Sequence, residues 1–289
     1  MTRRYILLDF DGTLTAPEHI TPAFLADYRM ELLAAIGEGH AALWDRTLAA
    51  VRAGSPELAW TLDGYEACPI AADPYILASA VATRVLASVD RGEDLRALPN
   101  ELYARLYMRH RAPFRPEVVD VLAALHATGA TLAVVSNAST GKIEGRLDEL
   151  LRDTPIRRAL SVYGGARKFS IRPATRETPA RAAFDALPDF VPSPASDGAL
   201  RRPTWLRRGA FFDALADVWG ADAAGPAKTV FCGDIWELDL ALPAALGCDV
   251  HLVERAAPLA THDAERTAVT MAPRASISAD LWGLVERVR

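Results

Sequence analysis

The segment from Tyr5 to Thr15 reads Tyr-Ile-Leu-Leu-Asp-Phe-Asp-Gly-Thr-Leu-Thr, four apolar residues followed at once by two aspartates and a glycine. A short apolar run that ends in an Asp-Gly turn is typical of a buried strand. We therefore expect a strand over Tyr5 to Leu8, with Asp9 and Asp11 just beyond its carboxyl end. Ligand sites in open α/β sheets lie at that edge, so the two acids are candidate functional residues.

The second half of the chain alternates between helical and strand-like patterns. The expected elements are helix Glu117 to Thr128, strand Thr131 to Val135, helix Lys142 to Leu151, and strands Leu160 to Tyr163, Thr229 to Cys232 and Val250 to Val253. Such alternation predicts an α/β fold, with a Rossmann-like parallel sheet flanked by helices. The first strand has no helix of its own in this pattern, so it belongs to the same sheet and the core is discontinuous in sequence.

The stretch between the first strand and this second half has apolar residues at helical spacing, from about Thr21 to His110. Glycines and prolines divide it into roughly four helices, and Pro113 and Pro116 close it. We predict an inserted all-helical domain over residues 16–112, and a core made of residues 1–15 and 113–289.

Two groups of residues are interpreted as having no role in a site. The segment from Leu187 to Arg208 is rich in proline and serine, which predicts an exposed loop, and its arginines are expected on a solvated surface. Those arginines are Arg201, Arg202, Arg207 and Arg208. Large side chains of the inserted region are assigned to packing or surface rather than to substrate: Trp44, Trp60, Tyr65, Tyr103, Arg105, Tyr107 and Arg109.

Composition gives only broad limits. The 289 residues are 51% hydrophobic and 24% charged with a formal net charge of -5, which is ordinary for a globular protein and suggests neither nucleic acid nor an anionic membrane as a partner. No apolar run approaches a membrane span, and Asp9 ends the first apolar run too early for a signal peptide. The three scattered cysteines indicate neither disulfides nor zinc, so a cytoplasmic location is expected, and no oligomeric state is favoured.

A second pair of acids follows another predicted strand, since Asp234 comes directly after Phe-Cys-Gly and Asp239 lies five residues further on. Folding as a parallel sheet would bring both acidic pairs to one edge. Two unit charges about 4 Å apart repel by about 4 kcal/mol at an effective dielectric near 20, so four carboxylates need a cation between them. Oxygen ligands without neighbouring histidine or cysteine favour Mg²⁺ over zinc.

Groups suited to binding a phosphate occur in the same half of the chain. Ser136 and Asn137 end the strand Thr131 to Val135, where a hydroxyl and backbone N–H groups can grip phosphate oxygens. Lys168 follows the next strand and supplies a positive charge of the kind that phosphoryl transfer requires.

These four segments, in this order, resemble the four motifs of the haloacid dehalogenase-like superfamily. The resemblance implies that Asp9 is a nucleophile and that Asp11 protonates the leaving group and then activates water. It also implies that Asp9, the backbone carbonyl of Asp11 and Asp234 hold Mg²⁺, with Asp239 as a further ligand or as a partner of metal-bound water.

The resemblance further implies that Ser136, Asn137 and Lys168 hold the substrate phosphate. Many relatives carry the third-motif lysine in a Lys-Pro pair, whereas the pair here is Arg172-Pro173. Lys168 is the preferred cation, and Arg172 remains an alternative.

Similar enzymes place a helical cap after the first motif, where this chain has its insertion, and capped relatives usually act on small molecules. Dehalogenating relatives lack an aspartate two residues after the nucleophile, so Asp11 favours phosphate chemistry. Residues 16–112 contain no lysine, which argues against the Schiff-base mechanism of phosphonate cleavage.

We therefore expect a Mg²⁺-dependent hydrolase that removes phosphate from a small phosphorylated metabolite through an aspartyl-phosphate. Two alternatives stay open. A phosphotransferase or sugar-phosphate mutase would use the same motifs if the cap excluded water. A non-catalytic binding protein on the same fold would be expected to have lost one of the acids.

Overall fold

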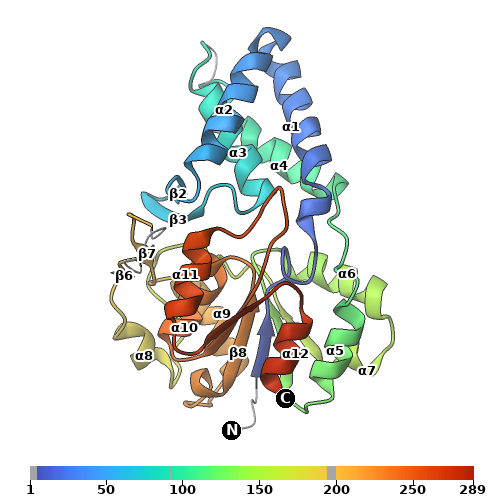
Figure 1. The fold of residues 1–289 in the computed structure, drawn as a ribbon, viewed down its shortest axis with the longest axis vertical. Coiled ribbons are helices and arrows are strands. Elements are labelled where there is room, and N and C mark those ends of the chain that lie inside the picture. Colours follow the sequence, from blue (N-terminus) through green and yellow to red (C-terminus); the bar gives the residue numbers. More distant parts are fainter. Residues whose placement is uncertain (1–4, 91–92, 194–199) are drawn as a thin grey trace.

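The computed structural model describes residues 5–90, 93–193 and 200–289, and its core is one six-stranded sheet (Figure 1). The strand order is β10-β9-β8-β1-β4-β5, and every neighbouring pair is parallel. The strands are β1 (Tyr5–Leu8), β4 (Thr131–Val135), β5 (Leu160–Tyr163), β8 (Thr229–Gly233), β9 (Asp249–Val253) and β10 (Ala275–Ser278). The five strands expected from the sequence are present. β10 was not expected, because Ala-Ser-Ile-Ser at a half-exposed sheet edge has no apolar run to mark it.

Helices cover both faces of this sheet, and alternate residues of each strand point to opposite faces. Tyr5 and Leu7 of β1 pack in a cluster with α9, α10 and α11, whereas Ile6 and Leu8 pack in a second cluster with α5, α6 and α12. The helices are α5 (Val118–His126), α6 (Thr140–Leu151), α7 (Pro155–Ala159), α8 (Arg181–Asp185), α9 (Gly209–Trp219), α10 (Ala241–Ala245), α11 (Asp263–Met271) and α12 (Trp282–Val288). The α/β Rossmann-like core is therefore confirmed.

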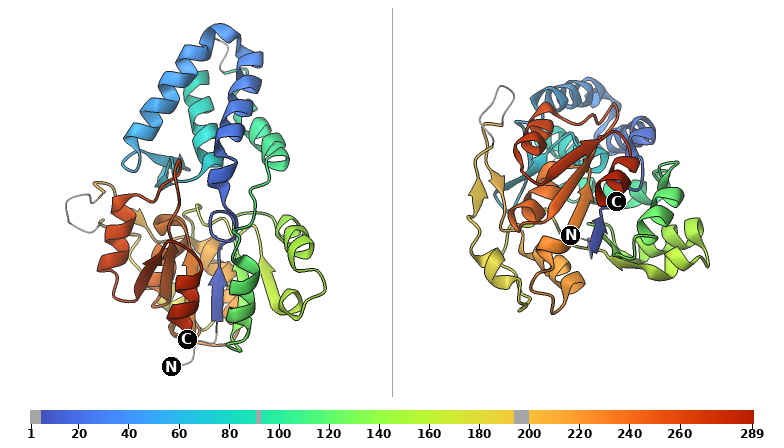
Figure 2. Two further views of the ribbon diagram at one scale, coloured as in Figure 1. Left: turned by 45° about the vertical axis from the view of Figure 1, so that its right-hand side comes forward. Right: turned by 60° about the horizontal axis from the view of Figure 1, so that its bottom comes forward.

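Residues 16–112 form a second, helical layer above the carboxyl edge of the sheet (Figures 1 and 2). Its α-helices among the described residues are α1 (Thr21–Ile36), α2 (Ala41–Gly54), α3 (Pro74–Leu86) and α4 (Leu98–Arg109), and they enclose an apolar cluster of their own that includes Tyr28, Trp44 and Leu106. The expected helices are present, and the assignment of Trp44 to packing is confirmed.

The inserted region is not wholly helical, because it also contains an antiparallel hairpin. Strands β2 (Ala59–Leu62) and β3 (Tyr65–Pro69) are joined by Asp63 and Gly64, whose φ angles are 51° and 84°. Asp-Gly with two positive φ angles is the preferred two-residue hairpin turn. This signal was present in the sequence, but it stands among prolines and glycines that were interpreted only as helix breaks.

The two chain connections to the inserted region lie side by side. The N–H of Ala16 donates to the carbonyl of Pro113 at 2.8 Å, and the N–H of Arg115 donates to the carbonyl of Leu14 at 2.9 Å. Thr15 and Phe114 thereby form an isolated antiparallel bridge. The region thus leaves and rejoins the core at one place, next to the loop that follows β1.

The segment from Leu187 to Arg208 differs from the loop that the sequence suggested. It contains a small antiparallel pair, β6 (Phe190–Val191) and β7 (Thr204–Trp205), while residues 194–199 lie outside the described residues. The expectation of solvated arginines is wrong for two of them, because Arg202 is 7% exposed and Arg208 is fully buried. A buried charge needs partners, and composition alone does not show where those partners lie.

Both buried arginines have such partners. Arg202 pairs with Glu237 through two hydrogen bonds of 2.6 and 2.5 Å. Arg208 donates to the carbonyl of Lys168 at 2.6 Å and to the carbonyl of Ala67, on β3, at 2.7 Å. Arg208 therefore ties the hairpin of the inserted region to the core at the lysine that the sequence analysis singled out.

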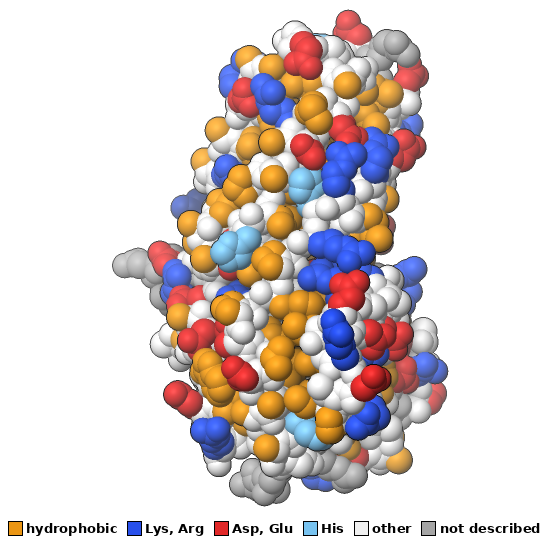
Figure 3. All heavy atoms as spheres, turned by 90° about the vertical axis from the view of Figure 1, so that its right-hand side faces the viewer, with side chains coloured by type: hydrophobic (Ala, Val, Ile, Leu, Met, Phe, Trp, Pro, Cys, Tyr) orange, Lys and Arg blue, Asp and Glu red, His pale blue; other side chains and the backbone are white. Residues whose placement is uncertain are grey.

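On the face shown in Figure 3, acidic and basic side chains are interspersed and do not gather in one large patch of either sign. A surface of this kind matches the small net charge. Within the described residues, no helix combines the length and the apolar character needed to cross a membrane.

Candidate active site

The predicted acids meet at the carboxyl edge of the sheet, between β1 and β8. From β1 the sheet continues through β4 and β5 on one side, and through β8, β9 and β10 on the other. Such a reversal of strand order opens a crevice where open α/β sheets bind ligands. Asp9 follows β1, Asp234 follows β8, and the N–H of Asp9 donates to the carbonyl of Cys232 at 2.8 Å.

Gly12 lets the loop after β1 pass close to Asp234. Its φ angle is +91°, and a Cβ added there would lie 2.3 Å from Oδ2 of Asp234. No other residue fits this conformation and this space without displacing the carboxylate. The glycine of the Asp-Gly turn is therefore required because of a contact made with a residue more than 200 positions away.

Lys168 lies at the centre of the acidic group. It is fully buried, and its Nζ donates to Oδ1 of Asp9 at 2.6 Å and to Oδ1 of Asp239 at 2.8 Å. Although burial alone would lower it, the pKa of Lys168 is raised by Asp239 and Asp9, so the side chain is a permanent cation. The alternative cation, Arg172, is exposed, and its backbone pairs with the segment at Arg208.

Three carboxylates lie close enough together to hold one metal ion. Oxygen atoms of Asp9, Asp234 and Asp239 all lie within 4.8 Å of one another, and all three residues are buried. Burial raises the pKa of Asp9 to about 7, against the lowering effect of Lys168. Burial and the neighbouring Asp239 likewise raise the pKa of Asp234 well above its ordinary value.

The negative charges of the cluster also exceed the positive charges that lie next to them. Lys168 offsets one of the three carboxylates, and Arg255, which lies 3.9 Å from Oδ2 of Asp234, is shared with the buried Glu265. The donors are carboxylate oxygens, which suit a hard divalent cation. The cluster therefore fits Mg²⁺, and a bound divalent cation would favour the ionised form of all three acids.

Asp239 is held by the turn in which it lies. The segment Trp236–Leu240 is a single π-helical turn, and Oδ2 of Asp239 accepts hydrogen bonds from the N–H groups of Asp234 and Ile235 at 3.2 and 2.9 Å. π-Helical turns are uncommon in proteins, and those that occur are often found at functional sites. Because Oδ1 binds Lys168, both oxygens of Asp239 have fixed positions, which makes this residue an orienting group as well as a potential ligand.

Asp11 points away from the metal cluster, toward the inserted region. Its Oδ2 accepts a hydrogen bond of 2.7 Å from the hydroxyl of Tyr107, on α4, and lies 3.4 Å from Nζ of Lys142, on α6. The carboxylate of Asp11 is thus separate from the three clustered acids, and it joins the loop after β1 to the inserted helix α4.

Ser136 and Asn137 lie at the end of β4, as expected. The hydroxyl of Ser136 accepts a hydrogen bond from the N–H of Ala138 at 3.4 Å, and Oδ1 of Asn137 accepts one from the N–H of Lys168 at 2.7 Å. Asn137 therefore positions the loop that carries Lys168. Both side chains, together with Asp9 and Asp11, line one cavity of about 300 Å³.

The opposite wall of this cavity comes from the inserted region and is aromatic. It includes Trp60 from the hairpin, Tyr75 from α3, and Tyr103 and Tyr107 from α4. The sequence analysis assigned Trp60, Tyr103 and Tyr107 to packing or surface. Trp60 and Tyr107 do pack against the apolar cluster of the inserted region, but all three side chains also line the cavity. Helical spacing identifies a shared face of a helix, but it does not distinguish a core from a cavity wall.

Three further side chains that the sequence analysis did not assign to a site, Tyr65, Arg105 and Arg109, do not line the cavity. Tyr65 packs against Trp205, with ring centroids 4.8 Å apart. Arg105 and Arg109 form ion pairs with Glu31 on the outer side of the inserted helices.

Comparison with known sequences gives the family. The family model for haloacid dehalogenase-like hydrolases matches residues 4–167, which is more than half of the chain and includes Asp9, Asp11 and Ser136. The chain belongs to the haloacid dehalogenase-like hydrolases. No curated protein sequence matches it.

Solved structures of this hydrolase fold are similar over the whole chain. One is described as a predicted phosphoglycolate phosphatase from Haemophilus somnus, with a TM-score of 0.55, 16% identity, and coverage of 100% of this chain and 99% of the other. Another is a candidate phosphatase from Clostridium difficile, with a TM-score of 0.52, 13% identity and coverage of 100% of both chains. A haloacid dehalogenase-like family hydrolase from Xanthomonas campestris has a TM-score of 0.48, 13% identity, and coverage of 100% and 95%. At these identities the two structures with TM-scores above 0.5 show a shared fold and no more, and the reaction has to be argued from the site.

Proposed function

We propose that this hydrolase is a Mg²⁺-dependent phosphatase that cleaves a small phosphomonoester through an aspartyl-phosphate on Asp9. The proposal rests on the different positions of the two aspartates of the first motif. Asp9 is held by Lys168 within a metal-binding cluster, and Asp11, two residues later, lies outside that cluster but faces the same cavity.

In the first step, a carboxylate oxygen of Asp9 attacks phosphorus, and the bond from phosphorus to the leaving alcohol oxygen breaks. The leaving oxygen gains negative charge as the bond breaks. Asp11 can neutralise it by giving up a proton, since its carboxyl group faces the cavity and is not a member of the metal cluster. An enzyme that displaces a halide has no need of this proton, which favours a phosphate ester over a haloacid as substrate.

In the second step, Asp11 takes a proton from a water molecule, and the resulting hydroxide oxygen attacks phosphorus. The bond between phosphorus and the Asp9 oxygen breaks, which releases phosphate and restores the Asp9 carboxylate. Lys168 balances negative charge at Asp9 in both steps, and its position is fixed by Asp239 and by the bond from its N–H to Asn137.

The residues that would hold the ion are Asp9, Asp234 and Asp239. The family resemblance adds the backbone carbonyl of Asp11 as a further donor. When bound, Mg²⁺ supplies positive charge that offsets the repulsion between these carboxylates and the incoming phosphate. Ser136, at the end of β4, provides a hydroxyl for a phosphate oxygen in the same cavity.

We assign residues 16–112 to a cap and residues 1–15 and 113–289 to the catalytic core. The paired connections at Thr15 and Phe114 support these boundaries, since they give the cap a single attachment next to the loop that carries Asp11. A cavity of about 300 Å³ is at the small end of ligand pockets, which supports a small metabolite as substrate.

The test is phosphate release from phenyl phosphate and from a panel of small phosphomonoesters, with Mg²⁺ or with chelator. The expected result is release that requires both the metal and Asp9, with Asp9→Asn reducing kcat by at least about 10³-fold. Trapping of a phosphorylated Asp9 would support the covalent step. Phosphate transfer to an added alcohol without release would instead indicate a transferase, and the absence of any reaction by the folded protein would refute the proposal.

A further inference from the structure

In the proposed reaction, the alcohol part of the substrate would face the cavity wall that comes from the inserted region. Among the described residues, the lysines and arginines near this wall are all bound to other groups. Lys168 binds Asp9 and Asp239, and Lys142 binds Asp11. Arg202 pairs with Glu237, and the guanidinium of Arg208 is used by backbone carbonyls. An anionic group on the alcohol, such as a carboxylate, would therefore enter this part of the cavity without a partner.

A carboxylate is instead available there. Asp73, at the start of α3, lines the cavity, and its Oδ1 accepts hydrogen bonds from the N–H groups of Tyr75 and Ile76 at 2.7 and 2.9 Å. Its Oδ2 has no hydrogen-bond partner within the described part of the chain. Burial, together with the charge of Asp11, raises the pKa of Asp73 to about 6, so this carboxylate would be stabilised by a positively charged neighbour.

Aromatic rings surround the same space. Tyr75 meets Tyr107 nearly at a right angle, with ring centroids 4.6 Å apart, and Tyr103 lies 5.3 Å from Tyr107. On the other side, Trp60 of the hairpin meets Phe169 of the core at 5.3 Å. Rings set at right angles form a corner in which more than one ring can approach a single cation.

One ammonium group of the protein itself is already bound between an aromatic ring and a carboxylate. The ammonium of Lys142 lies 3.2 Å from the centroid of the Tyr107 ring and 3.4 Å from Oδ2 of Asp11. An aromatic ring and a carboxylate together thus hold an ammonium at the edge of the cavity. No lysine or arginine of the described residues lies over Trp60, Tyr75 or Tyr103 in the same way.

We propose that the substrate is the phosphate ester of an amino alcohol, whose ammonium group is bound by Asp73 and by the rings of Tyr75 and Tyr103, while the Tyr107 ring next to them holds Lys142. This inference rests on the proposed phosphatase function and adds the class of alcohol. The phosphate lies at the acidic cluster and Lys168, while the positive group occupies the opposite, aromatic end of the cavity. The same arrangement disfavours a carboxylate-bearing ester such as phosphoglycolate.

The experiment compares choline phosphate with 3,3-dimethylbutyl phosphate, which has the same shape but a carbon in place of the charged nitrogen. Phosphoglycolate serves as the anionic ester and phenyl phosphate as a general reporter of phosphatase activity. We expect kcat/KM for choline phosphate to exceed that for dimethylbutyl phosphate by about tenfold or more, with phosphoglycolate the poorest of the four. Equal rates for the matched pair, or a preference for phosphoglycolate, would overturn the inference.

Asp73→Asn isolates the charge, because asparagine caps a helix as well as aspartate does. The variant is expected to lose most of the preference for choline phosphate over dimethylbutyl phosphate, measured as the ratio of kcat/KM for the two esters. Asp63→Asn is the matched control, since it removes an exposed charge from the hairpin turn of the same region and is expected to change neither rate. An unchanged preference in Asp73→Asn would refute the role of Asp73.

A binding measurement separates this inference from the proposed function. Calorimetry with Asp9→Asn and Mg²⁺ should show tighter binding of choline phosphate than of dimethylbutyl phosphate by a similar factor, whether or not any ester is cleaved by the wild type. If no ester, including phenyl phosphate, is cleaved, the phosphatase proposal fails. If the two esters bind equally, the amino-alcohol inference fails.

Discussion

The two walls of the cavity, one from the core and one from the inserted region, differ in the kind of side chain that forms them. The core wall is built around buried charges near the ends of strands, and two of them have several partners: Lys168 binds two carboxylates, and Asp239 accepts three hydrogen bonds. The wall from the inserted region carries aromatic rings on a hairpin and two helices, together with Asp73, and among the described residues its hydrogen bond to the aspartates of the core is the one from Tyr107 to Asp11.

This difference suggests that the two walls respond differently to mutation. A charge in the core wall cannot be removed without leaving another buried charge unpaired, so changes there should affect the fold or kcat. A ring in the opposite wall can be altered with little effect on neighbouring charges, so changes there should affect substrate preference. The following predictions test this contrast.

The largest effect is expected behind the core wall, at Glu265. It forms hydrogen bonds with the fully buried Arg255, which in turn donates to the carbonyl of Asp234, and it also accepts from the N–H of Trp236 at 3.1 Å. Glu265→Gln leaves the buried Arg255 with the more distant carboxylate of Asp234, 3.9 Å away, as its remaining counter-charge, and we expect the free energy of unfolding to fall by about 3–5 kcal/mol. Chemical denaturation measures the change.

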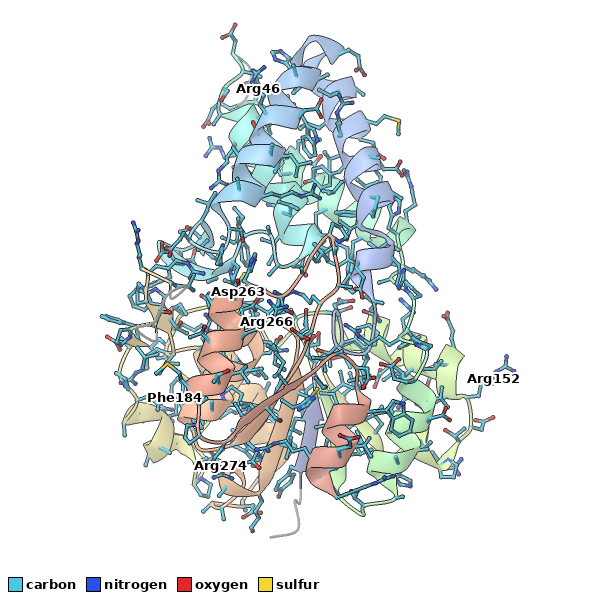
Figure 4. All side chains as sticks on the ribbon, in the orientation of Figure 1. Arg46, Arg152, Phe184, Asp263, Arg266 and Arg274 are labelled. Carbon is cyan, nitrogen blue, oxygen red and sulfur yellow. The ribbon has the colours of Figure 1, made fainter. Side chains whose placement is uncertain are left out.

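The matched control lies on the same helix. Asp263 pairs with Arg266 on the surface of α11 (Figure 4), and its side chain is 89% exposed, so Asp263→Asn should leave stability close to that of wild type. A loss in the control as large as in Glu265→Gln would contradict the contrast between buried and exposed pairs.

The pH dependence of stability gives a second readout for the same residue. Burial raises the pKa of Glu265, but Arg255 outweighs it and holds the pKa below the ordinary value of 4.5. The ionised carboxylate therefore stabilises the fold above about pH 4.5, and this contribution is lost as the pH falls through the lower, folded-state pKa. Stability of Glu265→Gln should decline less over this acidic range than that of wild type.

The next effect is expected at Lys168. Lys168→Met removes the cation that binds Asp9 and Asp239, and we expect kcat to fall by about 10²- to 10³-fold, the usual cost of losing one charge-stabilising donor at a reacting centre. Lys228→Met, which removes a lysine paired with Asp222, should leave kcat unchanged. Steady-state kinetics on phenyl phosphate provide the comparison, and a Lys168→Met enzyme with normal kcat would show that this lysine is only structural.

The smallest effect is expected at the contact between the two walls. Tyr107→Phe keeps the ring but removes the hydrogen bond of 2.7 Å to Asp11, and kcat should fall by about three- to tenfold, with little change in KM. Tyr103→Phe removes a hydroxyl from the neighbouring ring and should leave kcat near that of wild type. If both variants lose the same activity, the bond to Asp11 has no special role.

The central part of the fold and the core wall were predictable because both depend on local patterns. Apolar runs that end in Asp9 and in Gly233-Asp234 mark strands by their composition, and parallel strands bring their carboxyl ends to one edge whatever the sequence between them. The proximity of Asp9, Asp234, Asp239 and Lys168 follows from that rule.

The aromatic wall and the buried arginines were not predictable, because their environments are made by residues distant in sequence. Arg208 is buried because Lys168 and Ala67 present carbonyls to it, and nothing near Arg208 in the chain indicates either partner. Tyr103 and Tyr107 share one face of α4, which is equally consistent with a core and with a cavity.

The sequence by itself thus determined the α/β core and the identity of the residues available for chemistry, because strand patterns and the order of the acids are encoded over short distances. Only the tertiary structure decided which residues face the substrate from the other side. That choice depends on how α3, α4 and the hairpin pack above the sheet, and such packing is the sum of many contacts that no short motif records.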